Sequence, residues 1–203
     1  ALFSPGVAES SSFELDFANL GIRCYLADFS VDSPPVNHPL FEFDKLWIGT
    51  ETNKEVSITL ADWVDQKSPK NTDLILQMDI EGAEWSVLES EPIETLRRFR
   101  IIVIELHYLD AMMTNNLSIQ RVEAVFRKLN SEFVPVHIHA NNCCGTFRYL
   151  GLEIPAVIEL TLLRKDRFSK ATNRHPVQIP NPLDIKNVQN GKEILLSSDW
   201  TGK

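Results

Sequence analysis

Two short apolar runs, each followed at once by an acidic residue, constrain the fold of this chain more than any other feature. Residues 74–78 (LILQM) and 101–104 (IIVI) are the runs, and Asp79 and Glu105 come directly after them. Strands without an exposed polar face are typical of a parallel sheet that helices cover on both sides. The two runs therefore predict an α/β fold in which both are buried strands.

Strands and helices alternate through the first 130 residues of the chain. We expect strands at residues 1–4, 22–27, 41–48, 74–78 and 100–106, and helices at 11–20, 59–66, 83–89 and 118–129. This alternation is the signature of βαβ units and a mostly parallel sheet. Further strands at 133–138 and 156–163 have no long helix between them, so we expect them to pair antiparallel at one edge. From residue 166 onward, prolines and polar residues predict an irregular surface extension.

The net charge and the cysteines limit which binding partners and which cellular compartment we expect. The 203-residue chain has a net charge of −8, with 28 acidic against 20 basic residues. An acidic chain repels phosphates, so nucleic acid is not an expected partner. No apolar run approaches the roughly 18 residues of a membrane span. Two of the three cysteines, Cys143 and Cys144, are adjacent in the sequence. An odd number of cysteines with an adjacent pair is not typical of a disulfide framework, so we expect a free, inert thiol pair and a cytoplasmic location.

Several of the predicted strands end in residues suited to a binding site. In an open parallel sheet, ligands bind beyond the carboxyl ends of the strands, near the point where the strand order reverses. Gly6 follows the first strand and permits close approach to the backbone, and Asp28 follows the second, where it can accept hydrogen bonds from both hydroxyls of a ribose. The sequence has no GxSxG, GxxxxGK[ST] or GxGxxG motif, which argues against serine hydrolases, nucleotide triphosphatases and standard dinucleotide dehydrogenases.

Several segments together resemble the FkbM-like branch of the class I S-adenosylmethionine-dependent methyltransferases. The segments are MDIEGAEWSVLE, with ITLADWV before it and IIVIELH after it, the opening GVAESSSFELDFANLG with CYLADFS, and the closing HIHANN with EIPAVIELTLLRKD. The resemblance covers residues 1–165. It implies a Rossmann-like, mostly parallel seven-stranded sheet with an antiparallel edge strand and helices on both faces. Residues 166–203 would then be a C-terminal extension packed on or near this domain.

The resemblance also implies a cofactor site at the first strands. The backbone at Gly6 and the neighbouring Glu9 would face the methionine part of S-adenosylmethionine. Asp28 would bind its ribose beside Phe29, and Asp79 belongs to the same cofactor-binding set. The residues themselves leave other interpretations open: Gly6 in a plain turn, and Asp28 as a helix N-cap or a solvated loop acid.

Neighbouring acids suggest a metal. Asp79 and Glu105 would end side by side on strands about 4.8 Å apart, and such carboxylates repel unless a cation or shared proton lies between them. His107 follows Glu105 by two residues and points to the same side if the strand continues. We hypothesise a site for Mg²⁺ or another divalent metal built from Asp79, Glu105 and His107, with His107 alternatively a general base. In the alternative without metal, Asp79 holds the amino group of the cofactor.

A polar wall for the acceptor is expected near the ends of later strands. Glu81, His139, Asn141 and Asn142 are the candidate acceptor-binding residues. Glu84 is expected at the positive end of a helix dipole, and Trp85 in the core.

The leading interpretation is an O-methyltransferase that acts on a hydroxyl of a sugar or another small, oxygen-rich metabolite. A metal-dependent hydrolase using His137, His139, Asp79 and Glu105 is the alternative. A methyltransferase-like scaffold without activity is the third interpretation. The sequence leaves the oligomeric state, including a homo-oligomer, open.

Overall fold

The computed structural model describes residues 1–7, 10–53, 55–168 and 178–200. Its strands are β1 (Leu2–Pro5), β2 (Cys24–Ala27), β3 (Phe41–Asp44), β4 (Trp47–Gly49), β5 (Ser57–Thr59), β6 (Leu74–Met78), β7 (Phe99–Leu106), β8 (Phe133–Ala140), β9 (Thr146–Tyr149), β10 (Leu152–Pro155) and β11 (Ile158–Arg164). Its helices are α1 (Ser12–Asn19), α2 (Leu60–Lys67), α3 (Glu84–Ser90), α4 (Ile93–Leu96), α5 (Leu109–Met112) and α6 (Asn116–Glu132), with short 3-10 turns at Lys165–Arg167 and Ser198–Trp200.

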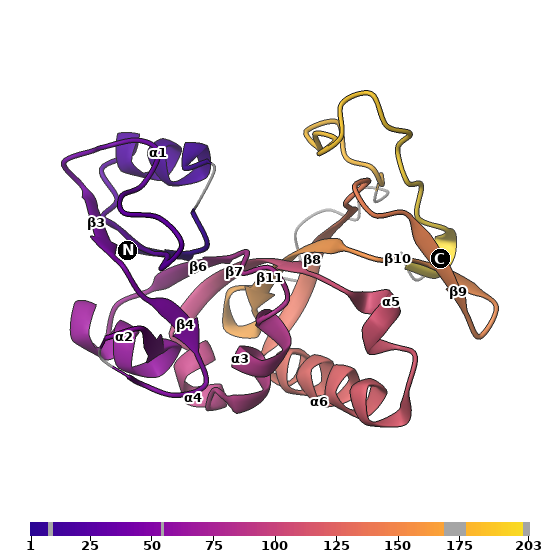
Figure 1. The fold of residues 1–203 in the computed structure, drawn as a ribbon, viewed down its shortest axis with the longest axis horizontal. Coiled ribbons are helices and arrows are strands. Elements are labelled where there is room, and N and C mark those ends of the chain that lie inside the picture. The colour runs from indigo at the N-terminus through magenta and orange to yellow at the C-terminus, as the bar shows by residue number, and fades with distance from the viewer. Residues whose placement is uncertain (8–9, 54, 169–177, 201–203) are drawn as a thin grey trace. The chain divides into compact units, whose positions relative to one another are not determined.

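Seven strands form one mixed, mostly parallel sheet in the order β3-β2-β1-β6-β7-β11-β8 (Figure 1). Pairing is parallel from β3 through to β7, and β11 pairs antiparallel with the edge strand β8. The expected α/β class and the antiparallel pairing at one end of the sheet are therefore confirmed. The order of the strands reverses between β1 and β6, which makes the carboxyl ends of these two strands the switch point of the sheet.

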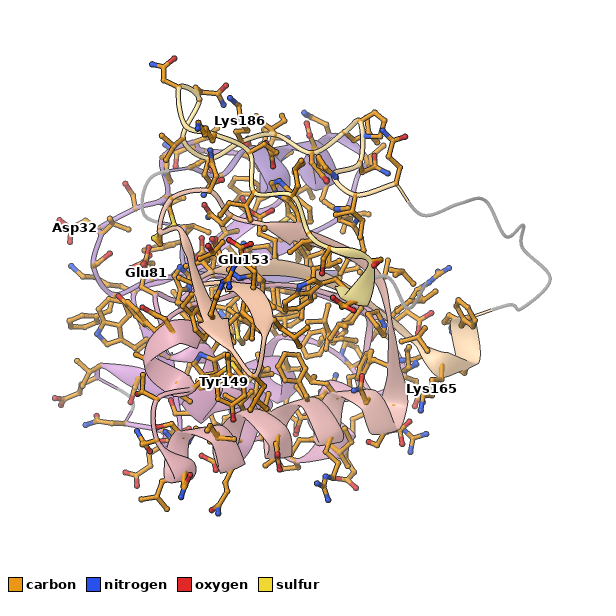
Figure 2. All side chains as sticks on the ribbon, turned by 90° about the vertical axis from the view of Figure 1, so that its right-hand side faces the viewer. Asp32, Glu81, Tyr149, Glu153, Lys165 and Lys186 are labelled. Atoms are coloured by element: carbon orange, nitrogen blue, oxygen red, sulfur yellow. A yellow bond between two sulfur atoms is a disulfide. The ribbon has the colours of Figure 1, made fainter. Side chains whose placement is uncertain are left out.

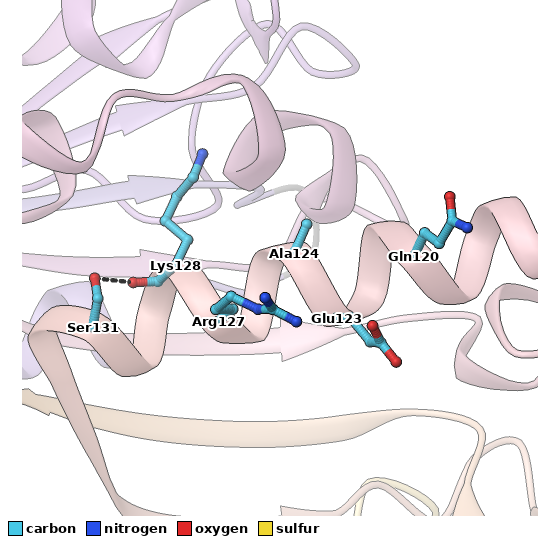
Figure 3. A pocket seen from close by; sticks show the side chains of 6 residues that line it. All are labelled: Gln120, Glu123, Ala124, Arg127, Lys128 and Ser131. Atoms are coloured by element: carbon cyan, nitrogen blue, oxygen red, sulfur yellow. Dashed lines mark hydrogen bonds between the residues drawn. The ribbon is translucent and has the colours of Figure 1, made fainter.

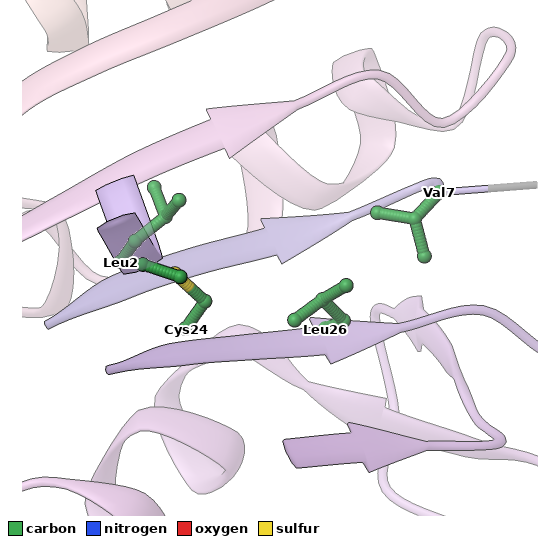
Figure 4. Packing of buried hydrophobic residues seen from close by; sticks show 5 residues of the cluster. Leu2, Val7, Cys24 and Leu26 are labelled. Atoms are coloured by element: carbon green, nitrogen blue, oxygen red, sulfur yellow. The ribbon is translucent and has the colours of Figure 1, made fainter. Parts of the chain in front are cut away.

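The chain divides into two compact units, Ala1–Ile104 and Glu105–Lys203, with the boundary inside β7. In the first unit, consecutive residues of β1 point to opposite faces, as a strand requires. Leu2 packs with Ala18 of α1 and with Cys24 and Leu26 of β2 (Figure 4). Phe3 packs instead against Trp63 of α2, at 5.0 Å between ring centroids. Thus α1 and α2 cover opposite faces of these strands.

The ends of the first helices follow the signals in their sequences. The hydroxyl of Thr59 accepts a hydrogen bond from the backbone of Asp62 at 3.1 Å and caps α2, as its position predicts. At the end of α1, Gly21 has a φ of 82°. Its N–H donates to the carbonyl of Ala18, and the next N–H, of Ile22, donates to Phe17, which is a Schellman ending.

In the second unit, the helix expected at residues 118–129 is α6, which buries Val122, Val125 and Leu129 and partly buries Phe126. The side chain of Asn115 caps this helix by accepting from the N–H of Ser118 at 3.0 Å. A hairpin of β9 and β10 follows β8, and the sequence patterns did not predict it. No helix in the described parts of the chain is long and apolar enough to cross a membrane.

Two expectations were wrong. Residues 41–48 form two strands instead of one, because a turn with Leu46 N–H donating to Asp44 O directs β4 into a separate two-stranded sheet with β5. Cys143 and Cys144 form a disulfide in the turn after β8 instead of a free thiol pair. Adjacent cysteines can form a disulfide with each other, and the odd number of cysteines does not exclude this.

Candidate functional site

The turn after β1 packs directly on the backbone at the end of β6. Gly6 has a φ of 87°, and a Cβ at this position would lie 1.5 Å from the carbonyl oxygen of Asp79. The N–H of Gly6 donates to Ala27 O at 3.0 Å, and that of Asp79 donates to Pro5 O at 3.3 Å. Only glycine fits here, because both the positive φ and the contact exclude a side chain. Gly6 is thus more than a plain turn residue: it lets the ends of β1 and β6 meet.

Asp28 lies 4% exposed directly after β2 and holds two turns together. Its Oδ2 accepts from the N–H of Val7 at 3.1 Å, and its Oδ1 accepts from the N–H of Ser30 at 2.8 Å and from its hydroxyl at 2.6 Å. Asp28 is therefore neither a solvated loop acid nor the N-cap of a helix. A carboxylate offers about four acceptor positions, so these contacts leave Oδ2 able to accept one more hydrogen bond.

Aromatic side chains lie next to Asp28. The rings of Phe29 and Trp47 are 5.8 Å apart, and Nζ of Lys45 lies 5.8 Å from the centroid of Phe29. Trp47 remains 46% exposed, which leaves a ring available at the surface. Glu9, the other residue expected at this cofactor site, lies outside the described residues.

The turn after β6 is held by Glu84. This side chain is fully buried, and its two oxygens accept from the N–H groups of Ile80 and Gly82, each at 2.9 Å. The contacts stabilise a turn in which Glu81, an exposed residue, has a φ of 55°. A non-glycine residue with positive φ is strained, and such strain concentrates at functional sites. Glu84 thus does more than offset a helix dipole, whereas Trp85 is a core residue, as expected.

A buried polar network beneath the first turn was not predicted from the sequence. The hydroxyl of Ser4 contacts the carboxyl group of Glu14 and the Oε1 of Gln77, the latter at 2.7 Å. Burial raises the pKa of Glu14 above its ordinary value of 4.5, while the hydrogen bond with Ser4 opposes the shift. A protonated Glu14 can donate to Ser4, which then donates to Gln77, so the one hydroxyl hydrogen suffices. Polar residues at Ser4 and Gln77, inside otherwise apolar strands, were the available signal.

In the second unit, the amide of Asn141 donates to the carboxylate of Glu105, and its oxygen accepts from the N–H of Cys143 at 2.9 Å. Because Asn141 is 2% exposed and both ends of its amide are already hydrogen-bonded, it positions Glu105 and is not available to bind the acceptor. His107 is also buried, with its ring 6.0 Å from that of Tyr108. These contacts support a positioned carboxylate at the end of β7.

His137, His139 and Asn142 bind other parts of the second unit. Each histidine contacts a carboxylate, and Asn142 contacts the backbone of the C-terminal segment. In the described parts of the chain, neither histidine belongs to a group of three or more side chains placed to hold a metal ion. The metal-dependent hydrolase that relied on them gains no support.

The surface of α6 carries a hollow of about 500 Å³ (Figure 3). It is lined by Gln120, Glu123, Ala124, Arg127, Lys128 and Ser131. These residues follow one another along a single helix, and none is a predicted site residue. The hollow is therefore a surface feature apart from the strand ends considered above.

The strand order, the glycine turn after the first strand and the acid after the second define an α/β protein of the class I methyltransferase type. The family model described as Methyltransferase FkbM domain matches residues 23–133, more than half of the chain. The chain belongs to the FkbM methyltransferase family, so it is an S-adenosylmethionine-dependent methyltransferase, and a small-molecule methyl acceptor is implied. A search of curated proteins found no significant match.

Proposed function

We propose that the protein methylates a hydroxyl group of a sugar or another small, oxygen-rich acceptor. The observation that carries the cofactor part of this proposal is the Asp28 carboxylate, which joins the turns after β1 and β2 and keeps one acceptor position for a ribose hydroxyl. Phe29 would pack against the adenine, and the backbone at Gly6, together with Glu9, would face the methionine part. The carboxyl end of β1 belongs to the switch point, and the end of β2 lies beside it, a position that suits a nucleoside ligand.

When bound, S-adenosylmethionine supplies an electrophilic methyl group on sulfur. The protein has to hold the acceptor oxygen in line with this methyl, about 3 Å from it, and to take up the proton that the hydroxyl loses. Asp79, Glu105 and His107 are the groups we assign to the proton and to the orientation of the acceptor. Asn141 would keep the Glu105 carboxylate in place through its amide.

A divalent cation fits the available donors. The register pairs Met78 with Ile104, so Asp79 and Glu105 are the next residues on neighbouring strands. Asp79, Glu81 and His107 offer carboxylate oxygens and an imidazole nitrogen of the kind that can hold a metal ion. Mg²⁺ prefers oxygen donors and keeps positions open for a substrate. Asp79 and His107, with Glu105 or Glu81, would hold such an ion, which would acidify a bound hydroxyl.

The strained backbone at Glu81 supports a role for this side chain in binding the acceptor or the metal. Glycine tolerates positive φ, so Glu81→Gly should keep or raise the melting temperature while it lowers kcat/KM. The exposed Glu89 of α3 provides the control, since Glu89→Gln should change neither quantity. Equal activity of Glu81→Gly and wild type would assign the strain to the turn alone.

The direct test is transfer of a labelled methyl group to sugars and small polyhydroxylated compounds, with and without EDTA. We expect transfer that fails in EDTA and returns with Mg²⁺ or Mn²⁺. The variant Asp79→Asn should lose transfer, and the control Asp73→Asn, an exposed acid at the other end of β6, should keep it. Full activity in EDTA would remove the metal and favour Asp79 as a ligand of the cofactor's amino group.

A further inference from the structure

The C-terminal segment of residues 181–193, called the strap below, is held by three side chains at the end of β8. The Nε2 of His137 lies 2.8 Å from the carboxylate of Asp184, and the Nε2 of His139 lies 3.0 Å from that of Glu193. These contacts join residues 47 and 54 positions apart in the sequence. Residues i and i+2 of a strand share a face, so both histidines meet the strap together.

The side-chain amide of Asn142 forms hydrogen bonds with the strap backbone through both its oxygen and its nitrogen, as a backbone peptide group would. Its side-chain oxygen accepts from the N–H of Val188 at 2.8 Å, and its Nδ2 donates to Val188 O at 2.9 Å and to Lys192 O at 3.3 Å. A Cβ at Gly191 would lie 2.8 Å from the same Nδ2, so glycine makes room for the amide. These hydrogen bonds can form only while the backbone of the strap keeps this one conformation.

The strap also has internal structure that prepares it for this contact. The N–H of Asp184 donates to Asn181 O at 2.9 Å, and the N–H of Asn181 donates back to the Asp184 carboxylate at 2.6 Å. Nζ of Lys186, labelled in Figure 2, donates to Gln189 O at 2.6 Å and to Gly191 O at 3.0 Å. Two small turns thus shape the segment before it meets β8.

Apolar burial contributes little to the attachment. Leu183 and Ile185 are 87% and 74% exposed, and Val188 is 45% exposed. Segments with few buried apolar contacts open at low free-energy cost. The polar contacts with His137, His139 and Asn142 therefore decide whether the strap stays closed.

The charges around His139 make its contact with the strap depend on pH. His139, 3% exposed, faces Glu159 of β11 at its Nδ1 and Glu193 of the strap at its Nε2, and Asp184 of the strap and His137 of β8 lie in the same cluster. Burial lowers the pKa of His139, but the hydrogen bonds with Glu159 and Glu193 outweigh it and raise the pKa above 6.5.

The sign of the effect follows from the raised pKa. The protonated imidazole stabilises the closed strap fully below about pH 6.5, and this stabilisation is lost as the pH rises through the pKa of the folded protein. Once the His139 imidazole is neutral, the carboxylates of Glu159 and Glu193 lie on either side of it without a cation between them. Their repulsion favours release of the strap.

We propose that the strap is a pH-dependent lid on the end of β8, closed when His139 carries a proton and open when it loses it. Opening frees the side chains of His139 and Asn142, which the closed strap occupies. If the proposed function holds, these are the groups that a polar acceptor would contact, and the strap then competes with the acceptor.

Hydrogen–deuterium exchange of the full chain tests the lid without any need for activity. Exchange of residues 181–193 is compared at about pH 6 and about pH 9, after correction for the intrinsic rate, in wild type and in Glu193→Gln. We expect slow exchange only at the lower pH in wild type, and about tenfold faster exchange in the variant at that pH. Glu153→Gln, which changes an exposed carboxylate in the β9–β10 hairpin, should behave as wild type.

Equal protection of the strap at both pH values, or no effect of Glu193→Gln at the lower pH, would overturn the proposal. Asn142→Ala is a second variant, and it removes hydrogen bonds to the strap without changing any group that titrates. It should therefore open the strap at both pH values. In a methyl-transfer assay at about pH 6, Glu193→Gln should raise kcat/KM for the acceptor several-fold. A protein that transfers no methyl group at all would contradict the proposed function, and the exchange data would still decide the lid.

Discussion

The contact between Gly6 and the backbone of Asp79 leads to the sharpest prediction about the fold of the site. Gly6 and Gly21 have almost the same backbone conformation, with φ of 87° and 82°. A Cβ at Gly6 would lie 1.5 Å from the Asp79 carbonyl oxygen, whereas nothing lies within 4 Å of a Cβ at Gly21. The pair Gly6→Ala and Gly21→Ala therefore separates the cost of the conformation from the cost of the contact.

The expected losses of stability differ clearly between the two variants. An alanine with left-handed backbone costs about 1–2 kcal/mol, and this cost applies to both variants. An added group in a filled space costs a further 1–3 kcal/mol, roughly, and the contact at Gly6 is with backbone that cannot rotate away, so about 3 kcal/mol is expected. In a chain of this length each kcal/mol lowers Tm by about 2–4 °C. Gly6→Ala should thus melt about 6–12 °C below Gly21→Ala.

Urea unfolding followed by circular dichroism gives the free energy of unfolding, and calorimetric titration gives cofactor binding. Gly21→Ala should bind S-adenosylmethionine as wild type does, because its position is at the end of α1. Gly6→Ala should lose binding, because the turn has to move away from Asp79. Equal stability of the two variants would refute the claim that this contact determines the turn.

Three further predictions concern two buried carboxyl groups and the disulfide. Glu84→Gln should lower the free energy of unfolding by about 2 kcal/mol, because the amide can accept from only one of the two N–H groups. Urea unfolding of the control Glu94→Gln, which changes an exposed side chain of α4, should show a change within about 0.5 kcal/mol. Glu14→Gln should raise Tm near neutral pH and flatten the Tm–pH curve above pH 4.5, since the raised pKa makes the stabilisation by the protonated carboxyl disappear as pH rises; an unchanged curve would contradict this. Thiol titration of the native protein should detect two thiols only after reduction of the Cys143–Cys144 disulfide, and reactive thiols before reduction would contradict the disulfide.

The third cysteine should stay silent in that titration. Cys24 is fully buried beside Leu2, and burial raises the pKa of its thiol to about 11. A thiol that remains protonated and inaccessible does not react with such reagents.

Periodicity predicted those parts of the fold that depend on local sequence. The apolar run of β6 was predicted because a strand that is covered on both faces leaves a continuous apolar run. The helix α6 was predicted because burial of one face leaves a periodic apolar pattern. Gly21 and Thr59 are local helix-end signals, and the helices expected at residues 11–20 and 59–66 lie within about one residue of α1 and α2. The split of residues 41–48 was missed, since it depends on the pairing of β4 with a distant strand.

The site was predicted in outline, from the acids at the strand ends. What the sequence could not reveal is how each polar group is already engaged. Asp28 binds two turns, Glu84 binds the turn after β6, and His139 binds the strap, all through partners that only folding brings near. Roles of the predicted site residues in catalysis, the domain boundary at residue 165 and a cytoplasmic location stay predictions.

The measurement that tests the central claim most directly is calorimetric titration of the purified protein with S-adenosylmethionine. It should include Asp28→Ala and, as the control from the same loop, Asp32→Ala, whose side chain is 93% exposed. We predict micromolar binding to wild type and to Asp32→Ala, and sharply weaker binding to a folded Asp28→Ala. Absence of binding to the folded wild type, or equal binding to all three proteins, would contradict the assignment of the cofactor site to the ends of β1 and β2.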